Sequence, residues 1–127
     1  MGHQDKIDVM KGNSAALSAQ LIGSRSLSNE EIRRLVSAQA LLLIDLLRRK
    51  CITVRYAEQA LFNLDTVKSL EKRKLKDCVE IIDWGMQLED WEAHTPERLD
   101  KAFQKIYDIA QNILLNKSVR PSRLPKM

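Results

Sequence analysis

The stretch SNEEIRRLVSAQALLLIDLLRRK, residues 28–50, decides the fold class of this chain. Ser28 and Glu31 form the capping-box pattern, in which each side chain bonds to the backbone amide of the other residue. Apolar residues then recur at steps of three and four, which is the spacing of one helix face, and further apolar residues flank them. Three basic residues follow, where they favour the negative end of a helix dipole. The stretch predicts a long helix at the centre of the molecule.

Two shorter helices are expected next along the chain. Thr53 is placed to cap a helix that continues to about Phe62. Asp65 is placed to cap another helix that begins at Thr66. Each cap would supply a side-chain oxygen for backbone amides that the first turn of a helix leaves unpaired.

The C-terminal half predicts two further helices. Residues 75–84 keep helical spacing, and Gly85 follows them at the position where a residue in the left-handed conformation ends many helices. Residues 95–97, Thr-Pro-Glu, supply a cap, a proline for the first helical position and an acid for the positive end of the dipole. The strongest apolar positions of the long helices should share one core: Leu43, Leu46, Ile82, Phe103 and Ile106.

Composition agrees with an all-α protein. The 127 residues include only four Gly and three Pro, and no stretch has the alternating pattern of a strand. We therefore predict a single-domain helical bundle of four to six helices over residues 27–116. Residues 1–26 are expected to form a weakly patterned N-terminal arm, and residues 117–127 a flexible basic tail.

The sequence shows no sign of export or of membrane insertion. The first residues carry scattered charges and lack the apolar core of a secretory signal. The most apolar run, residues 38–47, is too short to cross a bilayer and contains Asp45. Cys51 and Cys78 lack the spacing of a metal or redox motif, and a disulfide between them stays open. We expect a reduced, cytoplasmic protein that does not bind membranes.

Recognisable catalytic motifs are missing from the sequence. The two histidines lie far apart, and the chain has neither metal-ligand spacing nor a phosphate-binding glycine loop. Four acids that lie close together could converge as a two-carboxylate site: Asp83, Glu89, Asp90 and Glu92. Exposed or capping roles are commoner for such acids. We therefore expect no catalytic residue, no metal ligand, no cofactor and no enzyme activity.

Charge is distributed unevenly along the chain, although the net charge is only +4. Residues 77–100 hold eight acidic residues and one basic residue, a net charge of −7, whereas the rest holds twenty basic and nine acidic residues. The basic clusters lie at residues 33–34, 48–50 with Arg55, 68–76 and from 117 onward. No aromatic residues interleave these clusters, so a solvated basic face is favoured over a nucleic-acid surface.

Residues 84–99, WGMQLEDWEAHTPERL, hold both tryptophans of the chain at a junction between helices. We expect Leu88 and Trp91 to fold onto the core, and either Glu89 or Asp90 to be buried and to accept backbone amides. A buried acid is costly unless it is paired in this way. A structural corner is therefore expected, with an interaction site as the alternative. The candidate residues are Trp84, Gly85, Leu88, Glu89, Asp90 and Trp91.

Three stretches resemble an uncharacterised bacterial family of small all-helical proteins. They are LLLIDLLRRKCITVRYAEQALF at 41–62, IIDWGMQLED at 81–90 and TPERLDKAFQKI at 95–106. The family pattern is an apolar helix, an ISIxEAExxLF step, a GxxLED corner and a final helix after a proline. The matching positions are Ile52, Ala57, Glu58, Leu61, Phe62, Gly85, Leu88, Glu89 and Asp90. The resemblance covers about residues 32–115 and implies an all-helical fold, with the function unknown.

These observations favour a non-catalytic protein that acts by binding a macromolecule, with another protein as the favoured partner. Small helical proteins of this kind include regulatory, antitoxin-like and immunity-like proteins, which is an analogy at the level of the fold. A homodimer is expected, because so short a chain has little area to cover a helix as apolar as residues 38–47. Association with nucleic acid through the basic clusters is the alternative function, and an enzyme ranks third.

Overall fold

The computed structural model describes the backbone of residues 20–119 and the side chains of residues 20–115. Its elements are α2 (Asn29–Arg48), α3 (Val54–Ala60), α4 (Leu64–Lys72), α5 (Lys76–Met86), α6 (Leu88–His94), the 3-10 turn η1 (Pro96–Arg98) and α7 (Leu99–Val119). Residues 20–23 are also helical, and the described part of the chain contains no strand. The predicted single-domain all-α bundle is confirmed.

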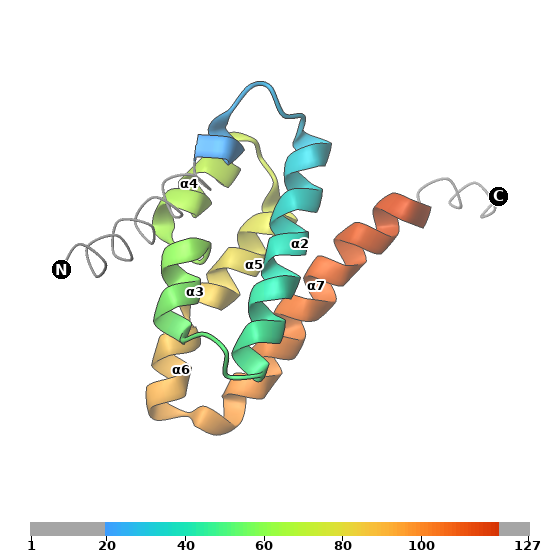
Figure 1. Ribbon diagram of the computed structural model, residues 1–127. Helices are drawn as coiled ribbons and strands as arrows, with labels where there is room; N and C mark the ends of the chain where they lie inside the picture. The colour runs from blue at the N-terminus through green and yellow to red at the C-terminus, as the bar shows by residue number, and fades with distance from the viewer. Residues whose placement is uncertain (1–19, 120–127) are drawn as a thin grey trace.

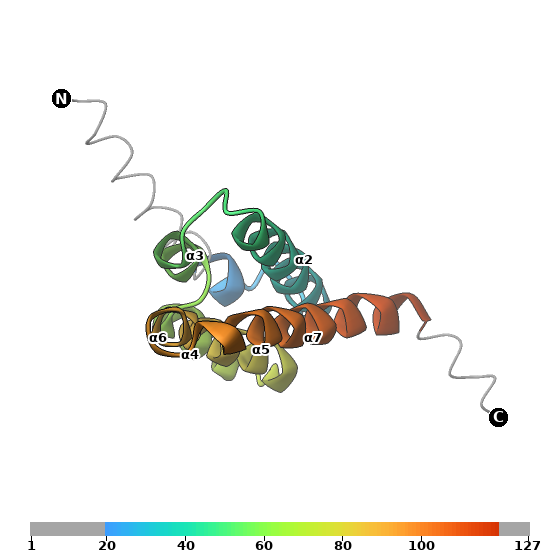
Figure 2. The ribbon, with the colours of Figure 1, turned by 90° about the horizontal axis from the view of Figure 1, so that it is seen from below.

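The helices form two layers around one core. Seen from below, α2 and α3 lie on one side, and α4, α5, α6 and α7 lie on the other (Figure 2). The two long helices, α2 and α7, pack against each other and run in opposite directions (Figure 1). At their crossing the end of α2 meets the start of α7, where Arg48 lies over the ring of Phe103 and donates a hydrogen bond to Gln104.

Helix starts follow the predicted caps in two cases and differ in two. The capping box of Ser28 and Glu31 and the cap by Thr53 are confirmed. At α4 the cap is Asn63, not Asp65, and its side chain accepts from the backbone amide of Thr66. Asn63 is suited to this position because its amide group also donates to backbone carbonyls of the preceding helix, which an aspartate could not do.

The predicted cap of the last helix is wrong in detail. Thr95 makes no side-chain capping bond, and Pro96 opens the 3-10 turn η1 instead of the α-helix. Leu99 begins α7 three residues later than the Thr-Pro-Glu pattern predicts. Tight 3-10 turns are frequent at the ends of α-helices, and they leave little trace in a sequence.

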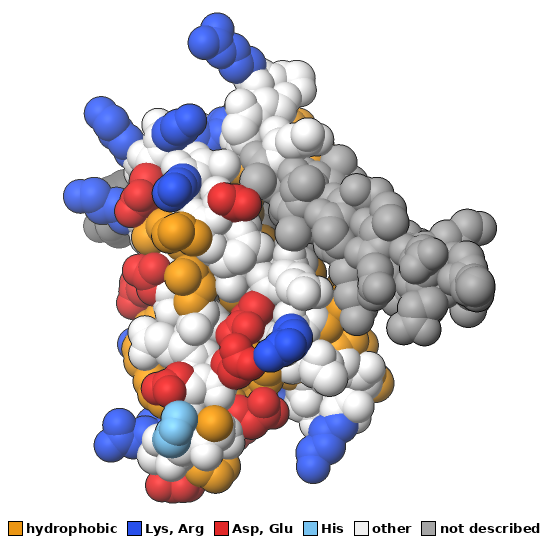
Figure 3. Space-filling model, turned by 90° about the vertical axis from the view of Figure 1, so that its left-hand side faces the viewer, with side chains coloured by type: hydrophobic (Ala, Val, Ile, Leu, Met, Phe, Trp, Pro, Cys, Tyr) orange, Lys and Arg blue, Asp and Glu red, His pale blue; other side chains and the backbone are white. Residues whose placement is uncertain are grey.

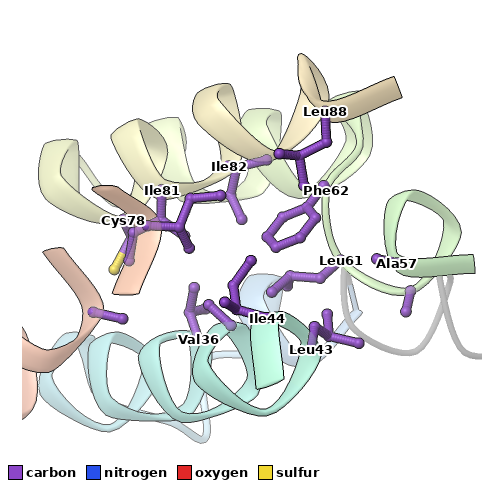
Figure 4. Close-up of a cluster of buried hydrophobic side chains, with 14 of the residues drawn as sticks. Val36, Leu43, Ile44, Ala57, Leu61, Phe62, Cys78, Ile81, Ile82 and Leu88 are labelled. Atoms are coloured by element: carbon purple, nitrogen blue, oxygen red, sulfur yellow. The ribbon is translucent and has the colours of Figure 1, made fainter. Parts of the chain in front are cut away.

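Most of the predicted core residues share one buried cluster. Leu43, Ile82, Phe103 and Ile106 belong to it, whereas Leu46 is only partly buried and lies outside it. Figure 4 shows side chains of α2 facing those of α5 across the gap between the two layers. The prediction that α2 is central is also wrong, because it exposes Leu35 and Leu42 on its outer side.

Part of the predicted N-terminal arm is docked on the bundle. Ile22 is buried in the core, and the guanidinium of Arg73 donates to the carbonyl oxygens of Ile22 and Ser24. A third donation, over 2.8 Å, reaches the side chain of Asn29 at the start of α2. The expected domain limits at residues 26 and 116 stay predictions; residues 1–19 and 120–127 lie outside the described part of the chain.

The two cysteines do not pair with each other. Cys51 is exposed and Cys78 is buried, and both are free thiols. Burial raises the pKa of the Cys78 thiol to about 12, so this residue is a core side chain with little thiolate character. No helix within residues 20–119 is both long enough and apolar enough to cross a membrane.

Candidate functional site: a tryptophan pocket at the α5–α6 corner

The corner after Trp84 is more helical than the sequence predicts. Only Gln87 separates α5 from α6, which is a helix that the pattern of residues 88–94 does not indicate. The amide of Gln87 donates to the carbonyl of Trp84 at 3.2 Å, and the amide of Trp91 donates to the carbonyl of Gln87 at 3.1 Å. Backbone carbonyls therefore satisfy these amides of the corner, and no buried acid is needed for them.

The prediction that Glu89 or Asp90 is buried at the corner is wrong. Both side chains are exposed. Oδ1 of Asp90 lies 3.1 Å from Nδ1 of His94, one turn later in α6, and Glu89 lies 3.4 Å from Arg55 of α3. The two acids therefore interact with side chains at the surface, and exposed pairs of this kind contribute little to stability.

Gly85 is needed for a close contact and not for a left-handed turn. It lies inside α5, and no described glycine has a positive φ, so its predicted role as a helix terminator is wrong. A Cβ added to Gly85 would lie 2.2 Å from Cγ of Phe62. The phenyl ring packs directly on this backbone, with the fully buried Leu88 beside it in Figure 4.

This contact gives a physical meaning to two positions of the family pattern. Phe62 ends the step after α3, and Gly85 opens the corner after the buried face of α5. The ring needs a neighbour without a side chain, and glycine in the middle of a helix is otherwise unfavourable by about 1 kcal/mol relative to alanine. Packing therefore explains why a helix-weakening residue stands here.

The two tryptophans of the chain meet at this corner. Their ring centroids are 5.4 Å apart and the rings are tilted by 60°. Both are partly buried and pack against the core, as expected for Trp91. Trp84 comes from α5 and Trp91 from α6, so the short connection through Gln87 is what brings them together.

The rings form one wall of a surface pocket of about 550 Å³, which we call the tryptophan pocket. It is lined by Trp84, Trp91, Arg98, Lys101, Ala102 and Lys105. The first two are sequence-predicted candidates, whereas the cations and Ala102 come from η1 and α7 and were missed. A signal for the cations is present: positions 98, 101 and 105 recur at steps of three and four, the spacing of one helix face.

Carboxylates lie close together between α3 and α6, on a different face of the molecule from the tryptophan pocket. Glu58 faces Glu89, and its burial and the charge of Glu89 raise the pKa of the Glu58 carboxyl to about 7. Glu92 acts in the same direction and Arg55 opposes it. In Figure 3 acidic side chains gather in the lower part of this face, near the histidine, with a basic side chain beside them.

The structure thus gives Glu89 a partner that the sequence analysis did not name as a catalytic candidate. Of the four grouped acids, Glu89 and Glu92 approach Glu58, whereas Asp90 pairs with His94. Within residues 20–119 no group of three or more His, Cys, Asp or Glu side chains could hold a metal ion.

Several members of the basic clusters are engaged within the molecule. Arg33 pairs with Asp77 at 2.5 Å, and this hydrogen bond raises the pKa of the guanidinium. Arg48 lies 3.7 Å from Asp100, and Arg73 holds the segment before α2. These arginines link elements of the fold, so part of the apparent basic surface serves stability.

The fold and the corner define a small single-domain all-α protein with an aromatic and cationic pocket. Comparison with protein families matches residues 27–127 to the family described as a protein of unknown function, DUF3969. The match covers most of the chain, and the protein belongs to this family. The resemblance to an uncharacterised family of small helical proteins is therefore confirmed. Neither the curated proteins nor the solved structures gave a match.

Proposed function

We propose that this protein is a non-catalytic binding protein that recognises another protein through the tryptophan pocket. The observation that carries the proposal is the wall of two tryptophans beside three cations. Tryptophan and arginine are the residues most enriched among side chains that dominate binding energy at protein interfaces. A partner that covered the pocket would bury the exposed parts of both rings, which supplies a driving force that is independent of charge.

The cations of the pocket are free to meet a partner. None of the side chains of Arg98, Lys101 and Lys105 makes an ion pair or a hydrogen bond within residues 20–119. Arg33 and Arg55, in contrast, each pair with an acid of another helix. Unpaired cations beside an apolar wall are better suited to recognition than to holding the fold.

Nucleic-acid association remains the alternative, and the charge distribution disfavours it at this pocket. Residues 77–100, which include α6 and most of α5, carry a net charge of −7. A polyanion that lay along the pocket would approach these acids, and its repulsion would offset the attraction of three cations. A regulatory or immunity-like role and a cytoplasmic location are further parts of the proposal that rest on the sequence alone.

Quantitative affinity capture from the native cell tests this function. The bait is the full chain, compared with a Lys101→Glu/Lys105→Glu variant and with a matched Lys68→Glu/Lys72→Glu control. The control pair is also exposed, has the same spacing of four and lies on α4. We expect one protein partner to be retained by the wild type and the control and reduced at least tenfold with the pocket variant. Equal capture by all three baits, or capture that nuclease or moderate salt abolishes, would contradict the proposal.

The expected homodimer stays a prediction. Leu35 and Leu42 are 40% and 56% exposed on the outer side of α2, so apolar area is available there. Light scattering over a range of concentrations measures the mass directly, and a mass that stays at 14.6 kDa would exclude the dimer.

A further inference from the structure

We infer that the tryptophan pocket accepts a short acidic segment of the partner, with two carboxylates about 6 Å apart and one large apolar side chain between them. This inference rests on the proposed function and adds the chemistry of the occupant. It follows from the spacing of the cations, from the shape of the aromatic wall and from the charges that surround the pocket.

The cation spacing fixes the charge pattern of the occupant. Lys101 and Lys105 lie four residues apart on α7, which places them on the same face, about 6 Å apart along the helix axis. Both side chains are exposed, and neither makes an ion pair with another described residue. Carboxylates at positions i and i+4 of a helix, or at i and i+2 of an extended strand, match this spacing. Arg98 extends the row by a further turn.

The apolar part of the lining favours an occupant that carries an apolar group as well as charge. Trp84 and Trp91 present indole surface from two helices, and Ala102 between the two lysines is fully buried. The pocket volume of about 550 Å³ is large enough for a leucine or phenylalanine side chain. A small inorganic anion would leave this wall uncovered, and a purely apolar segment would leave the cations without partners.

The geometry favours a peptide over a nucleotide base. The two rings are tilted by 60° and already contact each other at a centroid distance of 5.4 Å, so there is no slot between them for a planar base. Stacking on aromatic faces is the main sequence-tolerant contact in single-strand recognition.

An unbiased selection tests the inference. A display library of random twelve-residue peptides is selected against the wild-type chain, the Lys101→Glu/Lys105→Glu variant and the Lys68→Glu/Lys72→Glu control, after circular dichroism has shown that all three are folded. We expect the wild type and the control to enrich peptides with two acids and one large apolar residue. The charge-reversed variant should enrich peptides with Lys or Arg at the acidic positions. If it fails to fold, Lys101→Gln/Lys105→Gln replaces it and should lose the acidic enrichment.

Binding of the selected peptides is then measured by intrinsic fluorescence. Both tryptophans of the chain line the pocket, so a change in their emission reports occupation directly. We expect at least tenfold weaker binding for the pocket variant and no change for the control. Enrichment of neutral or basic peptides by the wild type would overturn the inference, as would a fluorescence change with a twelve-nucleotide oligo-dT but not with acidic peptides.

Different results would contradict the proposed binding function and the inference about an acidic occupant. A partner that is captured through the pocket but binds it with a neutral or basic segment overturns the acidic occupant and leaves the binding function standing. Capture that does not depend on Lys101 and Lys105 overturns both.

Discussion

Trp84 and Gly85 are neighbours in α5, yet Gly85 belongs to the packed core and Trp84 to a surface pocket. Gly85 lies under the ring of the buried Phe62, where a single added carbon would clash. Trp84 lines a surface pocket beside cations that make no ion pair within the described part of the chain. The same helix therefore contributes a tightly packed contact at Gly85 and part of the pocket lining at Trp84. Substitutions on the two sides should have separable effects on stability and on binding.

The largest effect is expected at Phe62. Its side chain is 1% exposed, and its removal would leave a cavity between the two layers of helices. We expect Phe62→Ala to lower the free energy of unfolding by about 3–5 kcal/mol. Urea denaturation followed by circular dichroism measures this change. A loss below about 1 kcal/mol would mean that the ring does not hold the layers together.

Gly85→Ala should destabilise the protein by a smaller amount. The new Cβ would lie 2.2 Å from Cγ of Phe62, so the ring must move, at a cost of about 1–3 kcal/mol. Helix propensity alone predicts the opposite sign, because alanine is favoured over glycine by about 1 kcal/mol. In a Phe62→Ala background the clash is gone, and Gly85→Ala should become neutral or stabilising. The same cost in both backgrounds would show that the two residues are not coupled.

The thermal stability should depend on pH through Glu58. Its pKa is raised from 4.5 to about 7, so between these values the folded state holds more protons than the unfolded state. The stabilisation is fully present below pH 4.5 and is lost as the pH rises through 7. We expect the melting temperature of the wild type to fall from about pH 5 to pH 8, and Glu58→Gln to show a smaller fall. Parallel profiles for the two proteins would exclude this role for Glu58.

The smallest stability effect is expected at Asp90. Its contact with His94 is exposed, with each side chain 74% accessible, so Asp90→Ala should change the free energy of unfolding by less than about 0.5 kcal/mol. The buried acid that the sequence predicts would instead cost about 1–3 kcal/mol, because amides would lose their acceptor. Chemical denaturation distinguishes the two values. The smaller value would confirm that backbone carbonyls, and not the Asp90 carboxylate, accept the hydrogen bonds of the corner amides.

Local patterns predicted the fold well, since caps and helical periodicity act within a few residues. The capping box at Ser28 is such a signal, and it places the start of α2 correctly. Gly85 shows the limit: the sequence marks it as unusual, but the reason is the ring of Phe62, which lies more than twenty residues earlier. A glycine that ends a helix and a glycine that makes room for a ring look the same in one sequence.

The candidate site was predicted only in part for a similar reason. Trp84 and Trp91 could be named because tryptophan is rare in this chain. Arg98 belongs to η1, and Lys101 and Lys105 belong to α7. Only the packing of α7 against α5 and α6, and of η1 against α6, places them beside the rings. The burial of Glu89 or Asp90 was mistaken because the formation of α6 pairs the amides that were expected to need a carboxylate.

Measuring binding and melting on the same variants tests the central claim most directly. The selected partner or peptide is titrated against the wild type, Lys101→Glu/Lys105→Glu and Gly85→Ala, and the melting temperature of each protein is recorded at the same pH. The pocket variant should lose at least tenfold in affinity and keep its melting temperature, because the two lysines make no ion pair within the described residues. Gly85→Ala should melt earlier but bind normally while folded. Unchanged affinity in the pocket variant, or affinity that falls only in step with the melting temperature, would show that the tryptophan pocket is not a binding surface.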